Sequence, residues 1–218
     1  MGAATERDDA VIALLTDARL TSYVRSTRTR SGAMRLYEWN LRAASAVMEL
    51  TGAVEVIARN ALDRELTSWA DRRNVGDRLD EAPLDPRGRQ DVVKAAERAA
   101  RGGSRDRHDR LVAELSFGFW RYLLSSRYHA SLWVPDLHRA FPRGPVELRF
   151  RRREVEGRMH RLHLARNRAV HHEPIHQRDL HRDLDDALEL LGWIHPAAAE
   201  WAADVTSLSA VLDARPSG

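Results

Sequence analysis

The sequence between Met34 and Trp69 reads MRLYEWNLRAASAVMELTGAVEVIARNALDRELTSW. Apolar or small residues recur in it at steps of three and four positions, namely at Met34, Tyr37, Leu41, Ala44, Met48, Thr51, Val54 and Ala58. Steps of this size place side chains on one face of an α-helix. The stretch therefore predicts one long amphipathic helix, with Gly52 as the expected position of any kink.

The rest of the chain continues the helical period and shows no alternating pattern typical of strands. Residues 83–88 and 142–145 interrupt the period with proline and glycine, and Pro174 limits the helix before it. Further helices are expected over residues 9–24, 90–100, 110–126, 146–170, 179–194 and 196–212. The predicted fold class is all-α, as a single domain over residues 1–218 with loop-rich stretches near 76–89 and 101–109.

The composition excludes several classes of protein. Of the 218 residues, 43% are hydrophobic and 31% are charged, which is typical of globular proteins. The chain has no cysteine, so disulfides, thiolate zinc sites and cysteine nucleophiles are excluded. No apolar run approaches the roughly 20 residues that span a bilayer, and residues 1–9 are polar and acidic, unlike a signal peptide. We therefore expect a cytoplasmic protein with no membrane partner.

The basic residues are almost all arginine. The chain has 35 Lys and Arg against 32 Asp and Glu, a net charge of +3, and Lys94 is its only lysine. A GC-rich genome accounts for much of this bias. Arginine nevertheless offers a planar fork of donors that suits phosphate, so the composition permits a polyanionic partner.

The segment RNRAVHHEPI, from Arg166 to Ile175, combines residue types that can cleave RNA without a metal. Cleavage requires the ribose 2′-hydroxyl to lose a proton, and histidine exchanges protons near neutral pH. Arginine stabilises the charge that develops on the phosphoryl oxygens, and asparagine can orient that arginine. The candidate catalytic residues are Arg166, Asn167, His171 and His172. In the alternative interpretation the two histidines only cap a basic helix end.

The spacing of these residues poses a geometric problem. Five steps along a regular helix rotate His171 by about 140° from Arg166, so the two side chains do not share a face. Either the helix ends or distorts before His171, which Pro174 favours, or two chains assemble the site.

Several other residues are candidates for binding RNA. The arginines of the basic helix could hold phosphates or form a solvated face, and Arg59 with Asn60 repeats an Arg–Asn pair within the first long helix. His160 falls on the helical stripe of Asn167 and His171, and a polar stripe facing RNA is preferred to a zinc site built from nearby histidines. The RNA-binding candidates are Arg59, Asn60, Arg149, Arg151, Arg152, Arg153, His160 and Arg168, and no metal or cofactor is expected. Aromatic residues are expected in the core, namely Phe117, Phe119, Trp120, Trp193 and Trp201.

Five blocks of sequence together resemble the Abi-like (abortive infection) family. They are LYEWN (36–40), VEVIARNAL (54–62), ELSFGFWRYLLSSRY (114–128), RNRAVHHEPI (166–175) and LLGWIHP (190–196). They follow the family's order and cover residues 20–201. The resemblance implies a HEPN-type helical bundle with additional helices, usually dimeric, with a role in phage defence or as a toxin. It also implies that Arg166 forms the catalytic pair with His171 or His172, beside Asn167.

These expectations lead to one preferred function and two alternatives. The preferred function is a metal-independent endoribonuclease that acts as a homodimer and leaves 2′,3′-cyclic phosphate and 5′-hydroxyl ends. An antitoxin protein or a small RNA is the expected neutralising partner. The first alternative is a non-catalytic RNA-binding protein that holds a small regulatory RNA. The second is an interaction module whose histidine motif only stabilises a dimer.

Overall fold

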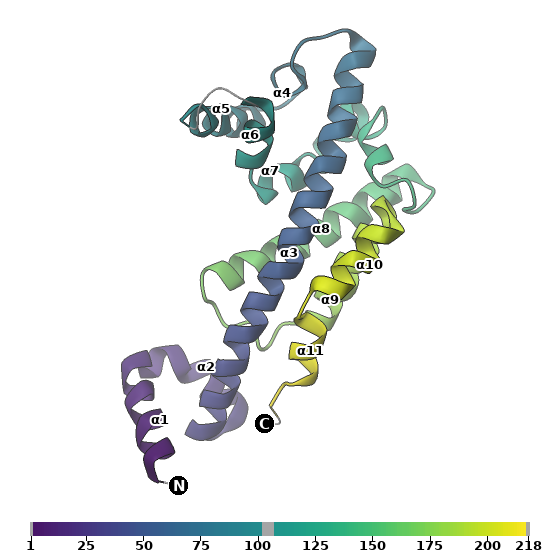
Figure 1. Ribbon diagram of the computed structural model, residues 1–218. Helices are drawn as coiled ribbons and strands as arrows, with labels where there is room; N and C mark the ends of the chain where they lie inside the picture. Colours follow the sequence, from purple (N-terminus) through teal and green to yellow (C-terminus); the bar gives the residue numbers. More distant parts are fainter. Residues whose placement is uncertain (1, 102–106, 217–218) are drawn as a thin grey trace. The chain divides into compact units, whose positions relative to one another are not determined.

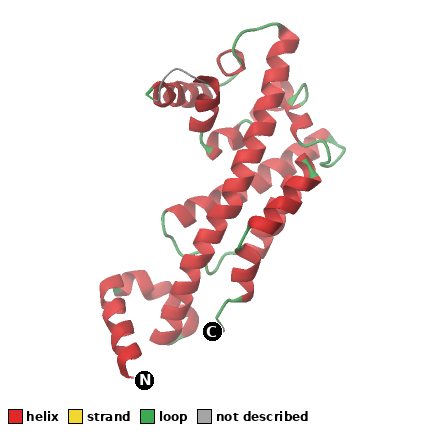
Figure 2. Cartoon of the chain, viewed as in Figure 1, coloured by secondary structure: helices red, strands yellow, loops and turns green. Residues whose placement is uncertain are grey.

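The computed structural model describes residues 2–101 and 107–216, and these residues form helices joined by short connections (Figure 1). No strand occurs among the described residues (Figure 2). The all-α prediction is therefore confirmed for this part of the chain. In chain order the elements are α1 (Gly2–Leu15), α2 (Asp17–Thr27), α3 (Arg30–Arg73), α4 (Arg78–Glu81), α5 (Pro86–Ala100), α6 (Arg107–Glu114), α7 (Phe117–Tyr122), η1 (Ser126–Tyr128), η2 (His129–Trp133), η3 (Leu137–Ala140), α8 (Leu148–Val170), α9 (Leu180–Ile194), α10 (Pro196–Val205) and α11 (Leu208–Asp213).

Three of the expected helices are each divided in two. Thr16 has a φ of 68° and separates α1 from α2 within the expected helix over residues 9–24. Ser116 begins α7 because its hydroxyl accepts a hydrogen bond from the Phe119 N–H at 3.2 Å, so residues 110–126 are not one helix. Residues 206 and 207 separate α10 from α11.

The two stretches expected to be rich in loops are partly helical. Asp85 caps α5 by accepting from the Gly88 N–H at 2.9 Å, so residues 86–89 are helical. Residues 102–106 of the stretch 101–109 lie outside the described residues, and α6 begins at Arg107.

The chain divides into two compact units, which are described separately. Unit 1 comprises residues 1–50, 164–184 and 205–218, and unit 2 comprises residues 51–163 and 185–204. The helices α3, α8 and α9 contribute residues to both units, and so does α10 through its last residue, Val205. A single domain over residues 1–218 stays a prediction.

Aromatic residues of α2 and α3 form the core of unit 1. The rings of Tyr23 and Tyr37 meet edge to face, with centroids 5.3 Å apart. Trp39 is 2% exposed, and its Nε1–H donates to the Val211 carbonyl at 2.7 Å, which ties α3 to α11. Contrary to the expected apolar face, Leu41 and Met48 are exposed. Other members of that face are buried as expected, including Met34 and Tyr37, and the buried side of α3 also includes Ala43, Val47 and Leu50.

Unit 2 has an aromatic core of its own. Phe117, Phe119 and Trp120 of α7 are buried, as expected for core residues rather than for stacking platforms. Trp193 is partly buried, with the Arg158 guanidinium 4.5 Å from its ring centroid. Trp201 is 51% exposed, so the expectation that it packs in the core is wrong.

Candidate functional site

Helix α8 ends at Val170, directly before the two histidines of the candidate motif. The Glu173 N–H donates to the Arg168 carbonyl at 2.8 Å, and the His172 N–H donates to the Ala169 carbonyl at 3.1 Å. This pair of bonds is the Schellman arrangement, which satisfies the last carbonyls of a helix. The regular helix therefore ends at Val170, but the His171 N–H still makes a helical bond, so this end does not by itself bring His171 to the face of Arg166.

His172 occupies the left-handed position of this helix end, with a φ of 55°. Glycine is the usual residue there, because a side chain with a Cβ is strained in that conformation. Non-glycine residues in sparsely populated conformations cluster at functional sites. The His172 backbone therefore has a conformational cost, and its imidazole is exposed to solvent.

His171 immediately precedes this turn and is also exposed. Its N–H donates to the Asn167 carbonyl at 3.0 Å, so the helical hydrogen-bonding pattern extends one residue past Val170. Both histidines of the motif are thus open to a substrate at the end of α8.

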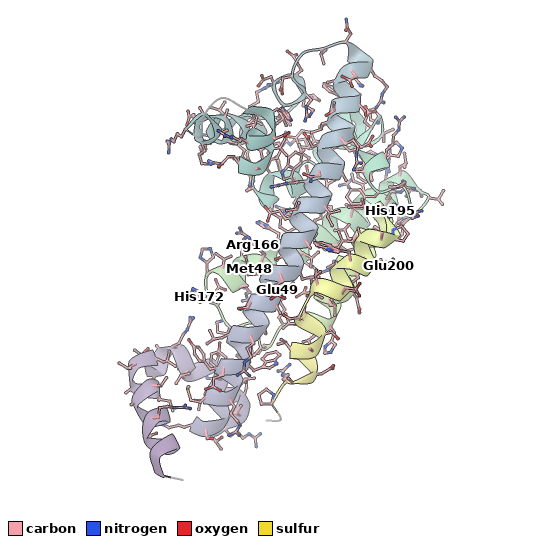
Figure 3. All side chains as sticks on the ribbon, in the orientation of Figure 1. Met48, Glu49, Arg166, His172, His195 and Glu200 are labelled. Atoms are coloured by element: carbon pink, nitrogen blue, oxygen red, sulfur yellow. The ribbon has the colours of Figure 1, made fainter. Side chains whose placement is uncertain are left out.

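Arg166 lies on the last turns of α8 (Figure 3). Asn167 follows it in the same helix, and both residues are half-buried. The Arg166 Nη1 is 3.5 Å from the Asn167 Oδ1, which allows the asparagine to orient the guanidinium. The Arg166 Nε is buried and has no hydrogen-bond partner among the described residues. A buried guanidinium donor without a partner is costly, so it marks this arginine as a candidate for binding an anion.

Arg168 and Glu173 form an ion pair across the helix end. The Arg168 Nε lies 3.3 Å from the Glu173 Oε2, and both side chains are 51% exposed. An exposed pair of this kind contributes little to stability. Arg168 therefore remains accessible as a candidate for binding RNA.

The segment after the motif is anchored to the core of unit 1. The Ile175 N–H donates to the Asn40 Oδ1 at 2.8 Å, and both residues are buried. Asn40 closes the LYEWN block and Ile175 closes the RNRAVHHEPI block, so the two blocks meet at this bond. Arg178 and Asp183 secure the next turn through two bonds of 2.5 and 2.7 Å.

His176 is a buried histidine within the same anchor and is 1% exposed. Its ring lies 4.5 Å from the Tyr23 ring, and its Nε2 is 3.3 Å from the Ser26 Oγ. Burial lowers the pKa of His176, and the nearby positive charge of Arg215 lowers it further. His176 therefore has a structural environment, in contrast to the two exposed histidines of the motif.

The other RNA-binding candidates belong to unit 2 and differ in exposure. Arg151 is buried and donates to the Pro145 carbonyl at 2.6 Å. Arg152 is buried and donates to the Leu124 carbonyl and to the Glu156 carboxylate, both at 2.6 Å. These two guanidinium groups hold the fold together and are not presented to solvent. The exposed candidates of this group are Arg149, Arg153, His160 and Asn60, while Arg59 is half-buried with its Nε 3.4 Å from the Asn60 Oδ1.

Two supporting residues were missed by the sequence interpretation. Asn40 and His176 hold the motif's segment in place, yet neither was assigned this anchoring role. The signal for Asn40 was a polar side chain between buried positions of an amphipathic helix, where an amide is retained only if it is hydrogen-bonded. No comparable signal marked His176, because histidine is frequent throughout this part of the chain.

Within residues 2–101 and 107–216, no group of three or more His, Asp or Glu side chains could hold a metal ion. No helix in the same part of the chain is long and apolar enough to cross a membrane.

No protein-family model matches the chain, and no curated protein or solved structure matches it.

Proposed function

We propose that this protein is a metal-independent endoribonuclease of the phage-defence or toxin type, similar to the Abi-like group of HEPN proteins. The observation that carries the proposal is the end of α8. There, a guanidinium with an unused buried donor, an amide beside it and two exposed imidazoles occur within residues 166–172. These groups match the needs of RNA cleavage through the 2′-hydroxyl.

The proposed reaction is an internal transesterification. One imidazole removes the proton from the 2′-hydroxyl, and the 2′-oxygen forms a bond to the adjacent phosphorus. The bond from phosphorus to the 5′-oxygen breaks, and that oxygen takes a proton from an imidazolium. The products are a strand ending in a 2′,3′-cyclic phosphate and a strand beginning with a 5′-hydroxyl.

The residues of the site have separate roles in this scheme. The Arg166 guanidinium stabilises the charge on the non-bridging phosphoryl oxygens through paired hydrogen bonds. Asn167 orients that guanidinium through its Oδ1. His171 and His172 are the candidates for the acid and the base, and either one could act with its counterpart from a second copy of the chain.

We further propose that the protein acts on RNA as a homodimer and is held inactive by an antitoxin protein or a small RNA. Two-fold pairing is the commonest form of oligomer, and it would bring two copies of the motif to one cleft. The mass in solution, measured by light scattering, tests the dimer. A monomer with full cleavage activity would contradict it.

The proposal is tested with matched RNA and DNA strands in the presence of EDTA. We expect the RNA alone to be cut, and we expect Arg166→Ala and His171→Ala each to lower turnover by ~10²-fold or more. His181→Ala is the matched control, because His181 is an exposed histidine of α9 outside the motif. Normal cleavage by both motif variants would refute the catalytic roles. If the wild type never cuts RNA and the motif variants lose affinity for it, the non-catalytic RNA-binding protein is the correct function.

A further inference from the structure

A groove lies in unit 2 between α7 and α8. Arg121 of α7 and four residues of α8, namely Arg153, Glu156, Gly157 and His160, line it. Its volume is about 390 Å³, and sites for small molecules span roughly 300–1,000 Å³. The groove therefore has room for a group of the size of one nucleotide.

The charge of this groove is positive. The Arg121 Nε is buried and has no hydrogen-bond partner among the described residues. None of the ion pairs found within the described part of the chain involves Arg121 or Arg153. Glu156 is the one carboxylate of the lining, and Arg152 neutralises it at 2.6 Å. Arg121 is thus left to attract an anion together with Arg153, whose positive charge also acts on the Glu147 carboxylate outside the lining and helps to lower the pKa of that group.

A glycine leaves space along one wall of the groove. Gly157 lies in the interior of α8, where glycine is unfavourable compared with alanine. A Cβ built at this position meets only the Arg161 Nη1, at 3.3 Å. A side chain longer than alanine at position 157 would therefore extend into the groove rather than into the core.

An exposed aromatic ring accompanies the arginines. Phe150 is 42% exposed, and the Arg153 guanidinium lies 5.6 Å from its ring centroid. An exposed ring beside a cation that contacts phosphate is the combination by which proteins hold single-stranded nucleic acid, with the base stacked and the backbone neutralised.

We propose that this groove binds single-stranded RNA, with a backbone phosphate held by Arg121 and Arg153 and an adjacent base stacked on Phe150. His160 lines the same groove and offers a further donor to the strand. The choice of RNA as the nucleic acid rests on the proposed function. The groove is a binding site separate from the cleavage motif, and its residues take no part in the reaction.

The test uses the full chain and a fluorescent single-stranded RNA carrying 2′-O-methyl groups. The methyl groups block the proposed reaction, so binding is measured without cleavage. We expect Arg121→Ala and Arg153→Ala each to weaken binding by about 10-fold at low salt and to reduce the slope of log affinity against log salt by about 0.7. Phe150→Ala is expected to weaken binding by about 10-fold with the slope unchanged, because stacking releases no counterion.

Arg139→Ala is the matched control, since it removes the same charge from an arginine that is 51% exposed and faces Asp136. Measured at the same salt concentration as the groove variants, it is expected to change affinity by less than about twofold. Gly157→Leu fills the groove and keeps every charge, and it is expected to weaken binding as much as Arg153→Ala. Wild-type affinity in both Arg153→Ala and Gly157→Leu would contradict the proposal that the groove binds RNA. A loss of affinity in Arg139→Ala equal to that in Arg153→Ala would also contradict it.

Cleavage of unmodified RNA separates this proposal from the proposed function. If the wild type does not cut RNA but the groove variants lose affinity, the groove is supported and the ribonuclease proposal fails. If the wild type cuts RNA and the groove variants keep its KM and affinity, the groove proposal fails and the ribonuclease proposal stands.

Discussion

Replacing His172 by glycine separates the backbone role of this residue from the role of its imidazole. The turn at the end of α8 depends on two backbone bonds, from the Glu173 and His172 N–H groups, at 2.8 and 3.1 Å. Neither bond involves the His172 side chain, so both survive the substitution. What changes is the conformational cost of a φ of 55°.

The size of the effect follows from two opposing contributions. The left-handed conformation destabilises a residue with a Cβ by about 1–2 kcal/mol, and glycine is free of this penalty. Glycine also increases the conformational entropy of the unfolded chain, which costs about 0.4–1 kcal/mol. We therefore expect His172→Gly to be more stable than His172→Ala by about 0.5–1 kcal/mol.

Urea unfolding of the wild type and the two variants measures this difference. His171→Gly is the control, because His171 is not among the described non-glycine residues of positive φ and should lose about 0.5–1 kcal/mol on substitution by glycine. Under the proposed mechanism, His172→Gly and His172→Ala lower RNA cleavage equally if this imidazole is the acid or the base. A His172→Ala protein as stable as His172→Gly would show that the residue is not left-handed in solution and would refute the reasoning.

Three further predictions concern the parts of the protein that support the site. Asn40→Ala should destabilise the protein by about 1–3 kcal/mol, because it leaves the buried Ile175 N–H without its 2.8 Å partner. The control Glu38→Ala, at an exposed neighbouring position, should change stability by less than about 0.5 kcal/mol. Equal effects in urea unfolding would contradict the anchoring role of Asn40. His176 faces Arg215 and Tyr23, burial raises the pKa of Tyr23 to about 12, and the pKa of His176 is lowered, so His176 in the unfolded chain protonates before folded His176 as the pH falls. The contribution of His176 to stability should therefore be complete above about pH 6.5 and lost as the pH falls towards the folded pKa. His176→Gln should reduce this pH dependence of stability, and an unchanged profile would disprove the assignment. Trp201→Ala should lower the free energy of unfolding by less than about 0.5 kcal/mol, because Trp201 is 51% exposed. Trp39→Ala should lower it by about 3–5 kcal/mol, because Trp39 is 2% exposed. Similar shifts in Tm would contradict this difference in burial.

The helical class and the end of α8 could be predicted from sequence because each depends on local chemistry. Steps of three and four residues specify helices, and Pro174 limits a helix wherever it occurs. The breaks at Thr16 and Ser116 were missed, because a single cap or a single left-handed residue interrupts the period too briefly to be seen in it. The expected apolar face of α3 was correct at most of its positions but wrong at Leu41 and Met48, which are exposed.

The candidate site was only partly predictable for a related reason. The motif itself is continuous in sequence, so Arg166 to His172 could be named in advance. The partners of this segment come from distant residues, such as Asn40 for the Ile175 N–H, and a sequence pattern does not specify such a pairing. Likewise, the run of arginines in α8 gave no indication that Arg151 and Arg152 are buried against carbonyl groups while Arg149 and Arg153 are exposed.

The most direct test of the proposed function is the chemistry of the cleaved ends. An RNA strand and the same strand with one 2′-deoxy nucleotide at the cleavage position are incubated with the protein in EDTA, and the ends are identified by mass spectrometry. We expect the unmodified RNA to yield a 2′,3′-cyclic phosphate and a 5′-hydroxyl, and we expect no cleavage at the 2′-deoxy position of the other strand. Products ending in a 3′-hydroxyl and a 5′-phosphate, cleavage of the 2′-deoxy strand, or loss of all cleavage in EDTA would contradict it.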